Sequence, residues 1–200
     1  MNRRVHSLVA AAATLSLASL ASGADGNAAN GEKLAYACLG CHGIENYKNA
    51  YPKYAVPKLG GQHEAYIRAA LKEYQDGARW HPTMRGYAAS LSDQERADLA
   101  AYFSAAAPKP AGAAPAGTPP EETGACVACH GRNGIGTIDE YPSIAGQHAD
   151  YLARALNDYR LGKRKNAIMQ PFAQQLTAAD IAALAIWYSK QPGLRTPTTD

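Results

Sequence analysis

The chain has 200 residues, of which 46% are hydrophobic and 18% charged, a balance typical of a globular protein and unlike that of a disordered or polytopic membrane protein. Its 20 lysines and arginines stand against 17 aspartates and glutamates, and the net charge of +3 is too small to indicate nucleic-acid binding. The four cysteines form two Cys-x-x-Cys pairs, each followed by a histidine, which argues against a scaffold of disulfide bonds.

Residues 1–24 have the pattern of a secretory signal peptide. Arg3 and Arg4 form a basic start, residues 8–21 are apolar, and residues 22–24 are small enough for cleavage. The apolar stretch is too short for a transmembrane helix, and an uncleaved anchor is the alternative. We therefore expect cleavage near Ala24 and export from the cytoplasm.

After this leader the chain contains one module twice. The pentad at 38–42 returns at 126–130, and from Pro57 onward the copies match at a constant offset of 85 residues. Proline and alanine dominate residues 105–123, which we interpret as a linker because proline cannot continue a helix. The sequence thus predicts domains at 25–104 and 124–192, followed by a tail at 193–200.

Each module is predicted to be helical, with no convincing strand pattern. A short helix is expected before each Cys-x-x-Cys-His, and apolar residues at helical spacing predict further helices over 64–77 and 148–162. Final helices are predicted to begin at Ser92 and Thr177, each with an acidic residue three positions later that completes a capping box. The expected fold class is all-α.

The pentad Cys-x-x-Cys-His is the attachment motif of c-type haem, in which two thiols form thioethers and the histidine binds the iron. The chain contains it twice, so two covalently bound haem c groups are expected. The thioether residues are Cys38, Cys41, Cys126 and Cys129, and the proximal iron ligands are His42 and His130. A redox-active thiol pair and a zinc site are the alternatives. No βαβ pattern surrounds either pair, and the 88-residue offset between the pairs is long for a zinc ribbon.

Met84 and Met169 are the predicted distal iron ligands. A single methionine more often packs in the hydrophobic core. These two, however, hold the same position in the repeat, in polar loops that contain proline. A thioether opposite a histidine raises the reduction potential relative to two histidines, which suits an electron carrier. His63 and His148 also repeat and leave bis-histidine coordination as an alternative; the role of His81 stays open.

Four further residues are candidates for supporting the haem. The carbonyls of Pro57 and Pro142 are expected to accept a hydrogen bond from each proximal histidine, although both prolines could simply shape a loop. Arg79 and Arg164 are candidate partners of haem propionates, with solvated arginines as the alternative. Lys163, Arg164 and Lys165 form either a docking patch for an acidic partner or an ordinary charged turn.

Taken together, these motifs resemble the cytochrome c4 family. Each Cys-x-x-Cys-His is followed by P-x-L/I-x-G-Q, a helix, G-x-R and then methionine, over about residues 31–190. The resemblance implies two tandem class I cytochrome c domains, related by a pseudo-twofold axis, with haem propionates facing across the interface.

The same resemblance implies a periplasmic one-electron carrier, held at most loosely at a membrane surface. Its expected donor is a quinol-oxidising complex or a dehydrogenase, and its expected acceptor is a terminal oxidase. A dihaem enzyme, such as a peroxidase or sulfur-compound oxidase, and a cytochrome subunit of a larger dehydrogenase are the alternatives. No nucleic-acid partner is expected.

Overall fold

The computed structural model describes residues 25–50, 53–107 and 114–197, so the predicted signal peptide lies outside the described residues. The first module consists of α1 (Ala28–His42), α2 (Glu64–Asp76), α3 (Pro82–Ala89) and α4 (Asp93–Ala105). The second consists of the 3-10 helix η1 (Glu121–Ala125), α5 (Val127–His130), α6 (Ala149–Arg160), α7 (Met169–Gln174) and α8 (Ala178–Ser189).

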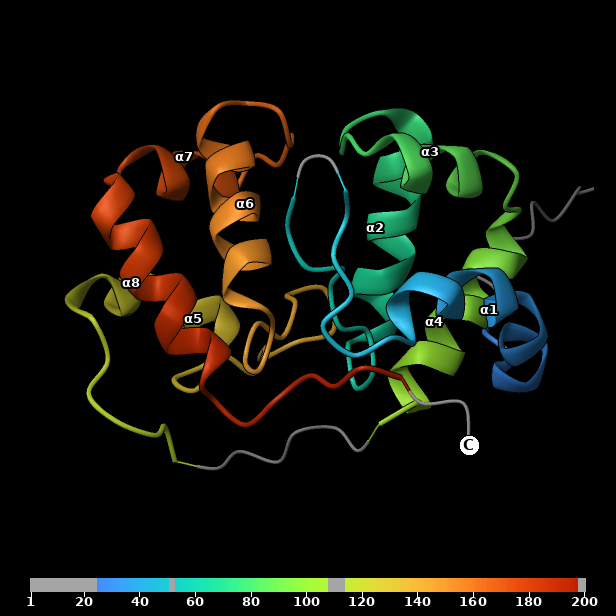
Figure 1. Ribbon diagram of the computed structural model, residues 1–200, viewed down its shortest axis with the longest axis horizontal. Coiled ribbons are helices and arrows are strands. Elements are labelled where there is room, and N and C mark those ends of the chain that lie inside the picture. Colours follow the sequence, from blue (N-terminus) through green and yellow to red (C-terminus); the bar gives the residue numbers. More distant parts are fainter. Residues whose placement is uncertain (1–24, 51–52, 108–113, 198–200) are drawn as a thin grey trace, which may run out of the picture.

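The described residues form two helical clusters side by side, and contain isolated backbone bridges but no strand (Figure 1). The fold is all-α, as predicted. None of the helices in these residues has the length and apolar character needed to cross a membrane.

Local signals in the sequence set the helix ends. Both predicted capping boxes are present, with Ser92 at the start of α4 and Thr177 at the start of α8. Gly77 ends α2 in the left-handed conformation, with φ of 76°, which a residue without Cβ adopts at no steric cost. In the second module α6 ends at Arg160 with Leu161 as its C-cap, and the left-handed residue is Gly162, with φ of 69°.

The two modules differ in the helix that carries the Cys-x-x-Cys-His motif. In the first module the motif ends the 15-residue helix α1, which crosses α4 so closely that a Cβ on Gly31 would lie 2.0 Å from the Asp98 carbonyl oxygen. In the second module the motif occupies the short helix α5, preceded only by η1. Pro119 and Pro120 stand directly before η1 and prevent a longer helix there.

Each module has its own hydrophobic core beneath its paired long helices. In the first module α2 and α4 contribute Ile67, Leu99 and Phe103. In the second, α6 and α8 contribute Leu152, Leu184, Trp187 and Tyr188. The repeated apolar pattern of the sequence therefore serves mainly for packing within each module.

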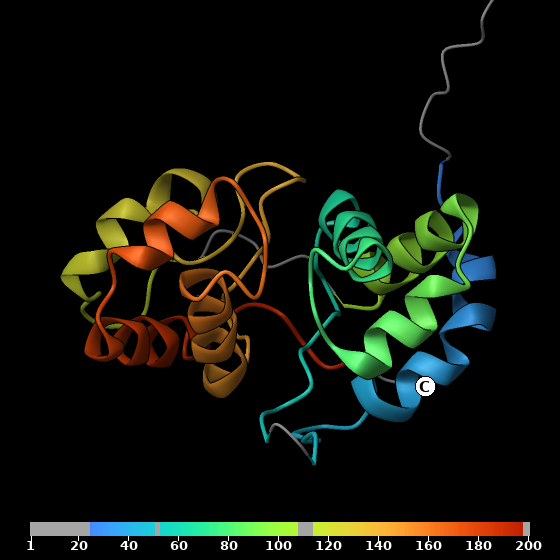
Figure 2. The same ribbon diagram turned by 90° about the horizontal axis from the view of Figure 1, so that it is seen from above.

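Hydrogen bonds between the modules come in equivalent pairs. The side chain of Gln62 donates to the carbonyl of Ser143 and accepts from its amide, both at 2.9 Å. Gln147 occupies the equivalent position and bonds in the same way to Lys58, at 3.0 and 2.9 Å. Because each module gives and receives the same bonds, the modules meet through equivalent surfaces, as in a twofold-symmetric pair (Figure 2).

Residues 193–197 form part of this interface. Arg195 exchanges two backbone hydrogen bonds with Gly60 of the first module, at 2.9 and 3.1 Å. Leu194 donates to the carbonyl of Ala145 at 2.8 Å and is buried. The sequence carries no periodic or capping pattern in this segment, which was predicted to lie in a tail.

Removing one of the two interface glutamines should destabilise the protein. Gln62→Ala would leave the amide and carbonyl of Ser143 buried without these partners, so we expect the free energy of unfolding to fall by about 2–3 kcal/mol. Gln147→Ala should cost a similar amount, and Gln174→Ala, on the exposed side of α7, should cost almost nothing. Urea unfolding of the haem-loaded protein measures all three. Equal midpoints for Gln62→Ala and Gln174→Ala would contradict this account of the interface.

Candidate haem-binding sites

The two predicted proximal histidines occupy equivalent positions at the ends of α1 and α5. His42 and His130 are 8% and 7% exposed, and the Nδ1 atom of each lies 2.8 Å from a proline carbonyl oxygen, of Pro57 and Pro142 respectively. A carbonyl can only accept, so Nδ1 carries the proton and Nε2 keeps its lone pair. Burial is the main cause that lowers the pKa of both imidazoles, so the neutral form that binds metals is favoured.

The four cysteines form no disulfide bond with one another and lie beside these histidines. Positions 38, 41 and 42 follow the i, i+3, i+4 spacing of α1 and therefore share one face of that helix. The turn from Cys126 to His130 repeats this arrangement, and the His130 amide donates to the Cys126 carbonyl at 2.9 Å. Burial raises the pKa of the Cys38 and Cys126 thiols, which is the opposite of the activation that a redox-active thiol needs.

Met84 and Met169 lie in first helical turns and not in loops, so the sequence-based placement was wrong in this respect. Met84 is the third residue of α3, and Met169 is the first residue of α7. Pro82 fits the first helical position, where no amide hydrogen bond is lost. The segments are too short and too polar to display helical periodicity, which is why the pattern indicated loops.

A different side chain caps each methionine turn. The Met84 amide donates to Nδ1 of His81 at 3.3 Å, and the Met169 amide donates to Oδ1 of Asn166 at 2.9 Å. These two capping residues hold equivalent positions in the repeat. The sequence left the role of His81 open. In the structure His81 caps α3 and thereby fixes the backbone at Met84.

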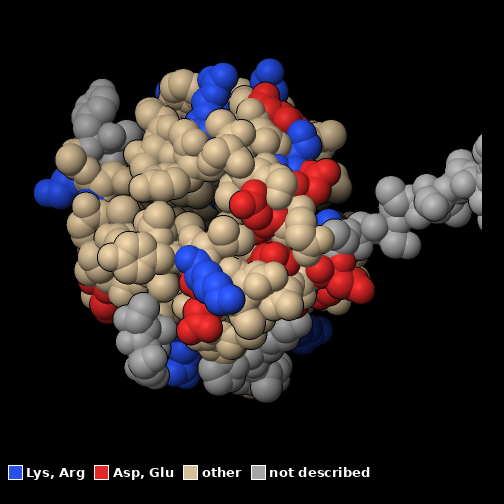
Figure 3. Space-filling model, turned by 90° about the vertical axis from the view of Figure 1, so that its right-hand side faces the viewer, with Lys and Arg blue, Asp and Glu red and all other residues tan. Residues whose placement is uncertain are grey.

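A continuous cavity of about 510 Å³ is lined by both Cys-x-x-Cys-His motifs and by both methionines. Apolar side chains of α2, α4, α6 and α8 form much of its wall. The surface on the side of the first module is hollowed among uncharged side chains (Figure 3). His63 and His148 are not among the lining residues; His63 instead lies 3.3 Å from Ser143 Oγ, in the other module.

Arg79 and Arg164 also line the cavity and are both only 6% exposed, so the alternative of solvated arginines is wrong. The backbones of these two residues pair in an isolated antiparallel bridge between the modules. Their side chains cross the interface: Arg79 donates to the hydroxyl of Tyr151, and Arg164 donates to the hydroxyl of Tyr66 at 2.9 Å.

Tyrosines are the neighbours that stabilise these two buried cations. Each guanidinium also lies over a tyrosine ring of its own module, Arg79 over Tyr74 at 4.7 Å and Arg164 over Tyr159 at 4.4 Å. Burial raises the pKa of Tyr66, but the positive charges of Arg164 and Arg79 and the hydrogen bond from Arg164 together outweigh burial and lower that pKa to about 8. Within the described residues neither arginine forms a salt bridge with a carboxylate, and Nε of Arg164 is buried without a hydrogen-bond partner.

These donors fit two haem c groups. Each module supplies two thiols, an imidazole Nε2 and a thioether sulfur, and the unpaired guanidinium donor group is suited to an anionic carboxylate such as a propionate. Among the described residues no three His, Cys, Asp or Glu side chains gather as a protein-bound metal ion would need. The sequence could not indicate that these arginines bond the hydroxyls of Tyr151 and Tyr66, because these tyrosines belong to the other module.

Comparison with known proteins supports this chemistry. The model of the cytochrome c family matches the chain twice, over residues 28–106 and 122–188. A cytochrome c4 of Pseudomonas aeruginosa is 38% identical over 92% of this chain and 96% of its own length. A thiosulfate dehydrogenase electron acceptor of Stutzerimonas stutzeri is 32% identical over 94% of this chain and 95% of its own. The crystal structure of reduced cytochrome c4 from Pseudomonas stutzeri matches with a TM-score of 0.65 and 30% identity, over 85% of this chain and 100% of that one.

Each of the two matched regions contains one Cys-x-x-Cys-His motif, so the chain carries two covalently bound haem c groups. Its role is electron transfer and not catalysis, in line with the relatives that it matches over most of their length. The chain belongs to the cytochrome c family and, within it, to the dihaem cytochromes c4.

Proposed function

We propose that this protein is an exported, periplasmic carrier of single electrons whose two haem irons are each bound by one histidine and one methionine. The pairs are His42 with Met84, and His130 with Met169. The observation that carries this proposal is the equivalence of the two sites. Both histidines line one cavity and use Nδ1 to bond a proline carbonyl, which leaves Nε2 for the iron, and both methionines line the same cavity.

When bound, the haem iron supplies the one-electron Fe(III)/Fe(II) couple. The protein keeps the histidine and methionine ligands in fixed positions while the charge of the iron changes. The carbonyls of Pro57 and Pro142 fix the orientation of the histidine rings, and the caps from His81 and Asn166 fix the methionine backbones. The apolar wall keeps water away from the site. Rigid ligands and a dry surrounding keep the reorganisation on electron transfer small.

Arg79 and Arg164 bind the haem propionates in this proposal. Neither buried cation has a carboxylate partner in the part of the chain that the structure describes, so the site there carries excess positive charge, which propionates would neutralise. Their hydrogen bonds to Tyr151 and Tyr66 cross the interface, so each propionate partner is positioned by the opposite module. The arginines thereby place the propionate edges of both haems near the module interface.

For redox partners we propose a dehydrogenase or a quinol-oxidising complex as donor and a terminal oxidase as acceptor. The similarity to a thiosulfate dehydrogenase electron acceptor supports a dehydrogenase as donor. It also favours a second candidate function, that of a cytochrome subunit bound to such an enzyme. Purification from the native membrane and periplasm separates the two: a carrier should elute alone, and a subunit should elute with a stoichiometric partner.

Carbon monoxide tests the carrier function directly. If both irons hold a methionine, carbon monoxide added to the fully reduced protein should leave its visible spectrum unchanged, because no coordination position is open. Met84→Ala should bind carbon monoxide at one haem and serves as the positive control. Binding by the unaltered protein at either haem would contradict the proposal and favour a dihaem enzyme.

A further inference from the structure

The two methionine-bearing segments lie on one face of the molecule. In Figure 1 the segment that contains α3 and the segment that leads to α7 both lie at the top. The Arg79–Arg164 backbone bridge and a 2.8 Å hydrogen bond from the Lys165 amide to the Ala78 carbonyl join the two segments. This face is therefore continuous across the interface between the modules.

Exposed apolar side chains occur on both halves of this face. Trp80 is 57% exposed, Leu161 60% and Ile168 50%. None of the three is among the residues that line the haem cavity, so haem does not account for them. Exposed apolar groups at the meeting point of two segments are typical of a surface that a partner covers.

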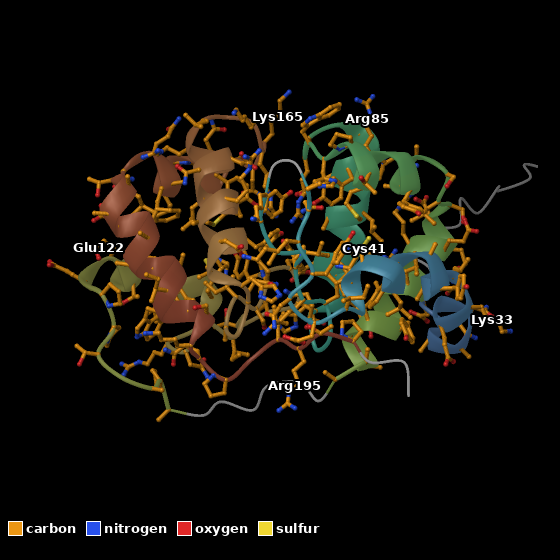
Figure 4. The ribbon with its side chains drawn as sticks, viewed as in Figure 1. Lys33, Cys41, Arg85, Glu122, Lys165 and Arg195 are labelled. Carbon is orange, nitrogen blue, oxygen red and sulfur yellow. The ribbon has the colours of Figure 1, made fainter. Side chains whose placement is uncertain are left out.

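The charges around these apolar groups have one sign. Residues 77–91 and 161–176 contain five arginines and lysines and no aspartate or glutamate. Two of the five, Arg79 and Arg164, are buried, which leaves Arg85, Lys163 and Lys165 exposed. Figure 4 shows Arg85 and Lys165 at the top, one on each module.

The acidic residues that precede the two segments are paired with bases of their own helices. Asp76 lies 2.6 Å from Lys72, and Asp158 lies 2.8 Å from Arg154. The outer end of the first module differs, because acidic and basic side chains are mixed there (Figure 3). The upper face thus differs in charge from the outer end of the first module.

We propose that this face, defined by Trp80, Arg85, Leu161, Lys163, Lys165 and Ile168, docks an acidic redox protein. The inference rests on the proposed carrier function. Arg85 follows Met84 and Ile168 precedes Met169, so a protein seated here lies beside both distal-ligand turns and can exchange electrons with either haem. The exposed cations steer a negatively charged partner, and the three apolar side chains form the centre of the contact.

The chemistry of the face favours a protein over a lipid surface. Its three apolar side chains come from two separate segments of the chain, and none belongs to a long amphipathic helix of the kind that inserts into a bilayer. A lipid surface would also gain nothing from contact with both methionine turns. A folded acidic protein with its own redox centre would pair with the exposed cations of this face and would also gain from its closeness to both methionine turns.

Charge removal tests the docking face. The probe is plant plastocyanin, a small acidic copper protein, mixed rapidly in its oxidised Cu(II) form with the reduced haem-loaded cytochrome, so that one electron passes from haem iron to copper. The triple variant Arg85→Gln, Lys163→Gln, Lys165→Gln should lower the second-order rate at low ionic strength by about tenfold or more, and the loss should shrink at high salt. The matched control Lys33→Gln, Lys190→Gln, Arg195→Gln removes the same charge from exposed positions outside this face and should change the rate less than about twofold.

A second pair of variants tests the apolar contact without changing charge. Leu161→Ser, Ile168→Ser should lower the rate about fivefold even at high salt, because apolar contact is not screened. Tyr36→Ser, Ile186→Ser replaces apolar residues that are 86% and 50% exposed on α1 and α8, and should have no effect. Equal rates for the test and control variants, in either pair, would overturn the proposal.

Vesicles provide the test of the lipid alternative. Cosedimentation with vesicles of phosphatidylcholine and phosphatidylglycerol should be weak and similar for both charge variants. Loss of vesicle binding in the Arg85, Lys163, Lys165 variant, with an unchanged rate toward plastocyanin, would assign the face to lipid and contradict the docking proposal. Failure of the carrier function can be told apart from failure of the docking proposal. If the carrier function is wrong, the haem-loaded protein should exchange electrons neither with plastocyanin nor with a small uncharged mediator.

Discussion

Replacing Met84 by alanine should remove about half of the near-infrared sulfur-to-iron charge-transfer band of the oxidised protein, and Met169→Ala should remove the other half. Only a thioether bound to ferric haem gives this band. Because the two sites are built from equivalent residues, each should contribute about equally, and the double variant should have no band. A spectrum of each variant, normalised to its haem content, makes the measurement.

The same substitutions should lower the reduction potential of the altered haem by on the order of 0.1–0.3 V, a fraction of the roughly 0.8 V over which axial ligands shift haem potentials. His81→Asn is a useful control, because it places at the first site the cap that Asn166 provides at the second. That variant should keep the full band. A full band in both alanine variants would show that the distal ligands are other residues.

Replacing Arg79 or Arg164 by glutamine should lower the reduction potentials by tens of millivolts. The added electron is stabilised by a nearby positive charge, and both guanidiniums are buried beside the haem cavity, where solvent screens them little. Loss of the cation therefore disfavours the reduced state. Spectroelectrochemical titration resolves the two potentials and gives the sign and size of each shift.

Two further variants separate charge from hydrogen bonding at this cluster. Tyr151→Phe and Tyr66→Phe remove the hydroxyl that each arginine bonds across the interface but keep both cations, so smaller shifts are expected. Arg195→Gln removes an exposed arginine and should leave both potentials unchanged. Shifts for Arg79→Gln no larger than those for Arg195→Gln would contradict the role of the buried arginines.

Local signals in the sequence predicted much of the fold. The capping boxes at Ser92 and Thr177, and the turn at Gly77, set helix ends where the pattern placed them. These features depend on residues three or four positions apart. The helices around Met84 and Met169 were missed because one or two polar turns carry no periodicity. The hydrogen bonds that fix the two methionine amides come from His81 and Asn166.

Contacts between the modules could not be predicted in the same way. The repeat showed that Gln62 matches Gln147 and that Arg79 matches Arg164, but not that each contacts the other module. The side-chain partners lie 72 to 98 residues away in sequence. Nor did the residues indicate that Arg195 would pair with Gly60. Equivalent positions in a repeat are thus a guide to an interface only once the arrangement of the modules is known.

The central claim is that each chain holds two haem groups through four thioether bonds, and intact-mass spectrometry of the purified protein tests it most directly. With haem quantitation alongside, the expected result is the mass of the polypeptide cleaved near Ala24 plus two haem groups, which remain attached under denaturing conditions. A mass equal to that of the bare processed polypeptide, or one haem per chain, would contradict the account.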